Sequence, residues 1–220
     1  MVRAAAGALV VAAAVAAVAA GVVAASPPKD AFTPAGKALA RSVTLRLADV
    51  PAGWKASASS NSTGEVTCAT FNPDQSDLTR IGHAESNFAS ADSLGAVGST
   101  VGVFSSAAQA QTAWNRLVRP QLVRCLASLF KQGISANSGT ATIRSTGRLS
   151  VPMTAPRRAA YRIVSDVVTG GQRVRAWVDV LLQGRGSADT VILVTSVASP
   201  PSAAVEQKLA AAIAGRLPSR

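Results

Sequence analysis

Residues 159–182 read AAYRIVSDVVTGGQRVRAWVDVLL and predict a β-hairpin that turns at Gly170 and Gly171. Two adjacent glycines between β-rich runs are typical of a two-residue hairpin turn. This turn pairs residue 169 with 172, and it predicts four apolar pairs on one face: Val167–Val174, Ile163–Val178, Tyr161–Val180 and Ala159–Leu182. The other face carries Asp166–Arg175, Arg162–Asp179 and Val164–Trp177. A slip of one residue would lose both charge pairs, so the apolar and the charged patterns predict the same register.

Further strands and helices are expected around this hairpin. Alternating apolar residues predict strands over residues 43–47, 83–89 and 97–105, and the apolar run 190–198 predicts a central strand covered on both faces. Helical spacing predicts helices over residues 106–117, from Pro120 to Gly133, and after Pro200-Pro201-Ser202. The second of these carries one apolar stripe: Leu122, Cys125, Leu126 and Leu129. The expected fold class is α+β, with a mostly antiparallel β-sheet of about five to seven strands packed against two main helices.

The N-terminus is typical of an export signal. Met1-Val2-Arg3 precedes an apolar run over residues 4–25, and small residues at 23 and 25 mark a cleavage site before Ser26. An uncleaved membrane anchor is the alternative, because an apolar run of this length can span a bilayer. Residues 26–41, rich in Pro, Ala and Gly, are expected to form a flexible linker. Residues 42–217 are expected to form a single extracytoplasmic domain, secreted or tethered by residues 4–25.

The two cysteines are expected to form a disulfide. Cys68 and Cys125 are the only cysteines and both lie in the part predicted to be exported. An oxidising compartment favours their pairing, which would stabilise the fold by about 4 kcal/mol in the chain-entropy model. A nucleophilic or redox role for Cys125 is disfavoured, because no histidine lies near it in the sequence and no CxxC spacing is present.

The charge is distributed unevenly along the chain. Of a formal net charge of +11, twelve basic and only two acidic residues fall between Arg116 and Arg185. This asymmetry predicts a basic face that attracts polyanions. An exported protein meets anionic lipid or cell-wall polymer rather than nucleic acid, and membrane contact is expected only through an uncleaved N-terminal segment. The candidate anion-binding residues are Arg144, Arg148, Arg157 and Arg158.

The second face of the hairpin offers a candidate apolar groove. Val164, Trp177 and Leu181 lie on this face. They form core if helices cover both faces of the sheet, and a groove for a small apolar ligand if they do not.

The sequence offers little for catalysis or metal binding. His83, the sole histidine, shares a strand face with Glu85, so an acid–base pair is geometrically possible, but no G-x-S-x-G elbow accompanies it. Asp74 and Asp77 lack the rest of a calcium loop and are expected to make turn or capping hydrogen bonds. One histidine and two cysteines do not supply a common zinc site. We therefore expect no metal, no cofactor and no catalytic residues.

One stretch resembles a known group of proteins. Residues 45–54, LRLADVPAGW, are similar to the opening of many exported actinobacterial proteins. With Cys68, Cys125, the 161–182 hairpin and a terminal amphipathic helix, the chain resembles the extracellular sensor-like domain of PknH-type receptor kinases and secreted proteins with a Mog1/PsbP-like α-β-α sandwich. The chain departs from them in having a single cysteine pair and neither a kinase domain nor a lipobox. The resemblance implies a binding or sensing module and carries over no catalytic residues.

The function expected from these observations is non-catalytic. The favoured hypothesis is an exported, sensor-like module that binds a ligand or partner at the cell envelope. A secreted hydrolase or esterase using His83 is the first alternative. A structural envelope protein that binds anionic polymers through its basic face is the second.

Overall fold

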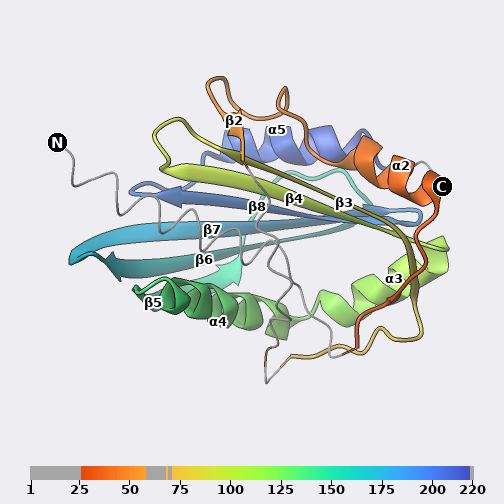
Figure 1. Ribbon diagram of the computed structural model, residues 1–220, viewed down its shortest axis with the longest axis horizontal. Coiled ribbons are helices and arrows are strands. Elements are labelled where there is room, and N and C mark those ends of the chain that lie inside the picture. The colour runs from red at the N-terminus through yellow and green to blue at the C-terminus, as the bar shows by residue number, and fades with distance from the viewer. Residues whose placement is uncertain (1–25, 58–67, 69–70, 219–220) are drawn as a thin grey trace.

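The computed structural model describes residues 26–57, 68 and 71–218 and shows an α+β fold (Figure 1). Within these residues it contains four helices, one eight-stranded sheet and one disulfide. The helices are α2 (Pro34–Val43), α3 (Ala107–Leu117), α4 (Pro120–Ala136) and α5 (Ala203–Ala214). The strands are β1 (Lys29–Asp30), β2 (Lys55–Ala56), β3 (Thr79–Ala89), β4 (Gly95–Phe104), β5 (Thr140–Arg148), β6 (Arg157–Thr169), β7 (Gln172–Arg185) and β8 (Ala188–Val197). The predicted α+β class is confirmed, and the sheet has eight strands rather than five to seven, with four helices among the described residues rather than two main ones.

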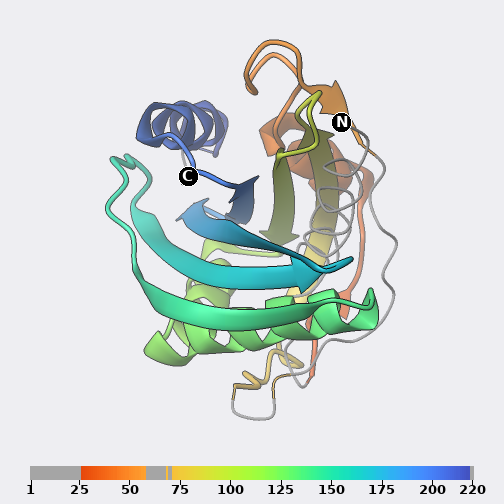
Figure 2. The same ribbon diagram turned by 90° about the vertical axis from the view of Figure 1, so that its left-hand side faces the viewer.

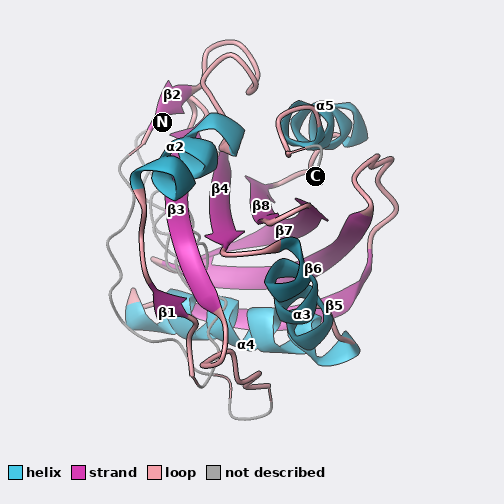
Figure 3. Ribbon diagram, turned by 90° about the vertical axis from the view of Figure 1, so that its right-hand side faces the viewer, coloured by secondary structure: helices cyan, strands magenta, loops and turns pink. Residues whose placement is uncertain are grey.

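The sheet is strongly curved and separates two layers of helices. Its strand order is β1-β3-β4-β8-β7-β6-β5, with β2 paired to β3, and every pairing except β1 with β3 is antiparallel. Figure 2 shows α4 beneath the β5–β7 part of the sheet and α5 on the opposite side. Figure 3 shows α2 in front of β3 and α3 near the end of β4. Strand β5 therefore forms one edge of the sheet.

The hairpin of β6 and β7 has the predicted register. Thr169 pairs with Gln172, and Gly170 and Gly171 both adopt positive φ, as a turn of this length requires. The side chains of Arg162 and Asp179 form two hydrogen bonds of 2.7 and 2.6 Å. Both expected charge pairs are thus present, and the side chain of Asp179 is 0% exposed.

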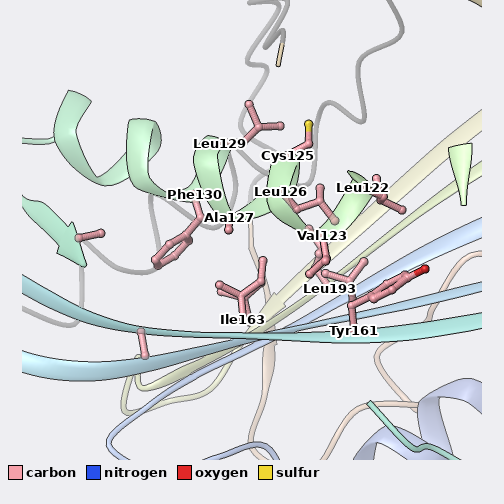
Figure 4. Packing of buried hydrophobic residues seen from close by; sticks show 14 of the residues in the cluster. Leu122, Val123, Cys125, Leu126, Ala127, Leu129, Phe130, Tyr161, Ile163 and Leu193 are labelled. Atoms are coloured by element: carbon pink, nitrogen blue, oxygen red, sulfur yellow. The ribbon is translucent and has the colours of Figure 1, made fainter. Parts of the chain in front are cut away.

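Helix α4 covers the largest of three apolar clusters in the described residues. Figure 4 shows Phe130 pointing from α4 towards the strand that carries Ile163, while Cys125 points away from the sheet. Residues at helical spacing on α4 are buried as predicted: Leu122, Cys125, Leu126 and Leu129. The helix continues through Gly133 to Ala136, beyond the predicted end, because Ile134 is also buried in this core.

Helices α2 and α5 cover the second core on the other face of the sheet. Apolar residues of β4 and β8, including Val101 and Ile192, pack there against Ala40 of α2 and Leu209 of α5. Strand β8 contributes Ile192 to this core and Leu193 to the α4 core, so it is the central strand covered on both faces that its apolar run predicts.

The predictions for residues 26–47 are wrong. The expected linker contains β1 and α2, and the expected strand at 43–47 is the end of α2 followed by a turn. Thr33 caps α2 by accepting a hydrogen bond from the backbone N–H of Gly36, and Pro34 occupies the first turn. Val43 is the last residue of the buried stripe of α2 rather than the first residue of a strand. The Thr33 cap and Pro34 are local signals of this helix, and packing of its buried stripe against β3 stabilises it.

Strand β5 was not predicted from the sequence. Its residues TATIRSTGR carry few apolar side chains, because the strand lies at the sheet edge and residues 144–148 are exposed. β-Branched residues such as Thr140, Thr142 and Ile143 are the signal that identifies it in retrospect.

The disulfide joins Cys68 to Cys125, with a Cα–Cα distance of 5.6 Å. It indicates an oxidising, extracytoplasmic environment. The expected export signal at residues 1–25 lies outside the described residues. Among the helices that the structure describes, none has the length and apolar character needed to cross a membrane.

Candidate functional site

A pocket of about 510 Å³ lies where the α3–α4 junction meets the segment that follows Cys68. Its lining residues are Phe71, Asn72, Pro73, Asp74, Asp77, Arg116, Arg119 and Gln121. A volume in this range accommodates a small ligand. The site is therefore built from two segments that are distant in sequence.

The disulfide and one ion pair hold these two segments together. Cys68 is bonded to Cys125, one turn into α4 from the pocket residue Gln121. Arg116 of α3 donates hydrogen bonds to both carboxylate oxygens of Asp77 and, at 2.9 Å, to the carbonyl oxygen of Asp74. These hydrogen bonds connect residues 71–77, which line one side of the pocket, to the α3–α4 junction, and they form without any ligand.

The acidic residues of the pocket have defined structural roles. Asp74 accepts a hydrogen bond of 2.9 Å from the backbone N–H of Ser76, which is the predicted turn interaction. Hydrogen bonds from Ser76 lower the pKa of Asp74, and the hydrogen bond from Arg116 lowers the pKa of Asp77. Both side chains are therefore carboxylates at neutral pH. No group of three or more potential metal ligands occurs among the described residues, these aspartates included.

The remaining polar groups of the pocket are suited to hydrogen bonding. Asn72 and Gln121 offer amide donors and acceptors, and Arg119 adds a guanidinium whose Nε donates to the carbonyl oxygen of Asn115. Phe71 and Pro73 supply apolar surface. The lining residues include no serine, cysteine or histidine, so they provide none of the usual nucleophile–base pairs.

The four candidate anion-binding arginines are divided between the two faces of the sheet. Arg157 and Arg158 are adjacent in β6 and therefore point to opposite faces. Arg157 forms an ion pair with Asp189 at 2.7 Å and is mostly buried, while Arg158 donates to the carbonyl oxygen of Ala155. Arg144 contacts Asp166 at 2.6 Å, and Arg148 is exposed at the end of β5.

The Arg157–Asp189 pair is part of the fold. Burial raises the pKa of Asp189 to about 6, opposed by the charge of Arg157. The pair lies over Gly184, where an added Cβ would overlap the Asp189 carboxylate and approach Arg157 Nε to 2.6 Å. The guanidinium of Arg157 is therefore already paired with a carboxylate of the same chain, that of Asp189.

The candidate groove residues have different environments. Leu181 is fully buried in the core beneath α5, as the core interpretation predicts. Val164 and Trp177 are half-buried and pair across the hairpin closer to its turn. The carboxylate of Asp166 lies next along this face and accepts from both Arg144 and Arg175, which lowers its pKa.

His83 and Glu85 form the expected pair away from the pocket. His83 Nε2 lies 3.0 Å from Glu85 Oε1. Ser86 points to the other face of β3, where its hydroxyl lies 2.9 Å from that of Ser99 and 3.2 Å from that of Thr44. No described hydroxyl or thiol forms a hydrogen bond with His83. Within the part of the chain that the structure describes, His83 and Glu85 thus form a pair to which no nucleophile is hydrogen-bonded.

A buried acidic pair was missed by the sequence analysis. Glu206 of α5 is 2% exposed and lies beside Asp179, and its Oε1 is 3.6 Å from Arg162 Nη2. Burial, followed by the hydrogen bond and charge of Asp179, raises the pKa of Glu206 to about 8. The hairpin register predicted the Arg162–Asp179 pair, but nothing local indicates that α5 adds a third charged group.

No protein-family model matches the chain, and no curated protein matches it either. The resemblance to PknH-type extracellular domains and Mog1/PsbP-like proteins stays a prediction.

Proposed function

We propose that this chain is an exported, non-catalytic binding module of the cell envelope that holds a small polar ligand in the pocket at the α3–α4 junction. The observation that carries the proposal is the pocket itself, which combines about 510 Å³ of space with amide and charged groups and lacks a nucleophile–base pair. Its sensor-like role and its place at the envelope follow from the resemblance and the predicted export signal.

The pocket chemistry favours a neutral ligand that carries hydroxyl and amide groups. Asp74 and Asp77 offset the charges of Arg116 and Arg119, so the lining has no net charge. Asn72 and Gln121 can each donate and accept, as a ligand with mixed hydroxyl and amide groups requires. The apolar surface of Phe71 and Pro73 suits a methyl group or a sugar ring. One or two N-acetylated sugar residues combine these features.

The test uses the disulfide-bonded protein with N-acetylglucosamine and its β-1,4-linked dimer as probes. We expect saturable NMR shifts of the Asn72 and Gln121 side-chain amides at millimolar ligand. The N72A/Q121A double variant should lose binding. Q132A is the matched control, because Gln132 lies on α4 roughly 18 Å along the helix from its start and bonds to Ser128.

Three outcomes would contradict the proposal. Inorganic phosphate alone could shift the same amides, which would indicate an anion site. N72A/Q121A could bind as well as the parent, which would place the ligand elsewhere. Turnover of an ester probe that disappears in H83A would favour the hydrolase alternative.

A further inference from the structure

Strand β5 leaves one edge of the sheet open. It is the last strand in the sheet order, and among the described residues it pairs only with β6. Side chains at residues 144–148 are exposed on both faces of the strand. This edge lies on the side of the sheet that faces the viewer in Figure 2. An open edge strand is a template for the backbone of another chain.

The direction of the unpaired backbone groups follows from one hydrogen bond. The N–H of Leu149 donates to the carbonyl oxygen of Ala160 at 2.9 Å, so residue 149 faces β6. Inward and outward residues alternate along an antiparallel strand, which turns residues 147 and 145 towards β6. Thr146 and Arg148 therefore point their N–H and C=O groups away from the sheet. These groups can form hydrogen bonds with an added strand.

A β-bulge separates this part of the edge from the start of β5. The register with β6 shifts between Ile143 and Ser145, and Arg144 at the bulge contacts Asp166. A bulge at a sheet edge limits indiscriminate pairing because it interrupts the regular ladder. The regular segment from Ser145 to Arg148 remains available.

The charge at this edge selects the partner. Strand β5 has two arginines and no acidic residue. Arg148 has no ion-pair partner among the described residues, and Arg144 and Arg175 share the single carboxylate of Asp166. A second copy paired at β5 would bring like charges together, whereas an acidic segment would be attracted.

We propose that β5 binds an extended, acidic peptide segment of a partner protein, which adds to the sheet as a further strand along residues 145–148. Backbone hydrogen bonds to Thr146 and Arg148 provide the pairing, and carboxylates on the peptide face that lies on the α4 side of the sheet contact Arg148. This mode of recognition combines main-chain affinity with side-chain selectivity. The surface is separate from the small-ligand pocket.

The probe is a short capped peptide of alternating valine and glutamate. We expect it to shift the backbone amides of Thr146 and Arg148 in NMR titrations and to bind less tightly as salt increases. T146P removes an outward N–H that β6 does not use, and edge strands accept proline at such positions. It should weaken binding about tenfold, as expected for lost hydrogen bonding at this scale. R148E should weaken binding at least as much and does not depend on the folding of the proline variant.

The controls separate this surface from other basic sites and from the pocket. K55E makes the same charge change on exposed β2 at the far end of the sheet and should leave peptide binding unchanged. N72A/Q121A should also leave peptide binding unchanged. Absence of peptide binding at β5 is therefore distinguishable from absence of sugar binding in the pocket. Equal binding of a valine–lysine peptide, unchanged binding by R148E, or concentration-dependent dimerisation through the Thr146 amide would overturn the proposal.

Discussion

The carboxyl group of Glu206 lies inside the fold next to another carboxyl group. Arg162 makes a bidentate contact with Asp179, so Glu206 is left with only a longer approach to the same guanidinium. A second buried negative charge here is unfavourable, and Glu206 retains its proton until the pH approaches about 8. Its ordinary pKa is 4.5, the value expected when the chain unfolds.

This difference predicts that stability falls as pH rises. Between 4.5 and about 8 the folded protein holds a proton on Glu206 that the unfolded chain has released, so raising the pH favours unfolding. The raised pKa of Asp189 causes a similar decline in the free energy of unfolding, but only up to about pH 6. The interval from 6 to 8 therefore isolates Glu206.

The test is E206Q, which keeps the side-chain shape and always offers an N–H to Asp179. We expect urea midpoints of the parent to decrease from pH 6 to 8 and those of E206Q to stay nearly level, with a gain on the order of 1 kcal/mol for the variant at pH 8. If the urea midpoints of the two proteins change in parallel from pH 6 to 8, Glu206 is ionised in the folded protein over that whole range, which would contradict the prediction.

At the scale of elements, helix α2 is held against β3 by a contact between two glycines. A Cβ on Gly36 would overlap the carbonyl group of Ile81, and a Cβ on Gly82 would overlap the backbone of Gly36. The backbones of helix and strand therefore approach more closely than any side chain permits. This contact brings Ala40 and Val43 into the second core.

The prediction concerns G36A. Alanine is favoured over glycine in a helix by about 1 kcal/mol, but overlap with backbone atoms does not relax by rotation of a side chain. We expect the overlap to dominate and the unfolding free energy to fall by about 2–4 kcal/mol. G102A is the control, because a Cβ there meets nothing closer than 3.8 Å. An increase in stability for G36A in chemical denaturation would mean that α2 is not held closely.

At the scale of the whole molecule, the disulfide connects parts of the chain that are 57 residues apart. It joins the segment before the pocket to α4, and the sheet that α4 covers includes strands from the C-terminal half. Arg216 provides a second long-range connection, with hydrogen bonds of 2.7 and 2.6 Å to Asp49 near α2. These two connections bring both ends of the described domain into one structure.

Removal of the disulfide should therefore destabilise the entire domain and the pocket. For a C68A/C125A variant we expect a loss of about 4 kcal/mol in unfolding free energy, with weaker binding of the sugar probes. A reductant should lower the melting temperature of the parent and leave that of the variant unchanged. If parent and variant melt together under oxidising conditions, the crosslink contributes nothing to stability.

The sequence alone determined those features whose signals are local. The Gly170-Gly171 turn determined the hairpin register, and the spacing of Leu122, Leu126 and Leu129 determined the buried side of α4. The pairing of Cys68 with Cys125 followed because no other cysteine is present. Each inference rests on a turn sequence, on helical spacing or on the number of cysteines.

Tertiary structure decided the features that depend on residues distant in sequence. The close packing of α2 on β3 depends on the contact between Gly36 and Gly82, and Glu206 acquires its raised pKa only when α5 buries it beside Asp179. The pocket likewise exists only where Asp77 meets Arg116. Packing and electrostatic energies depend on distances through space, and these distances are set when the chain folds.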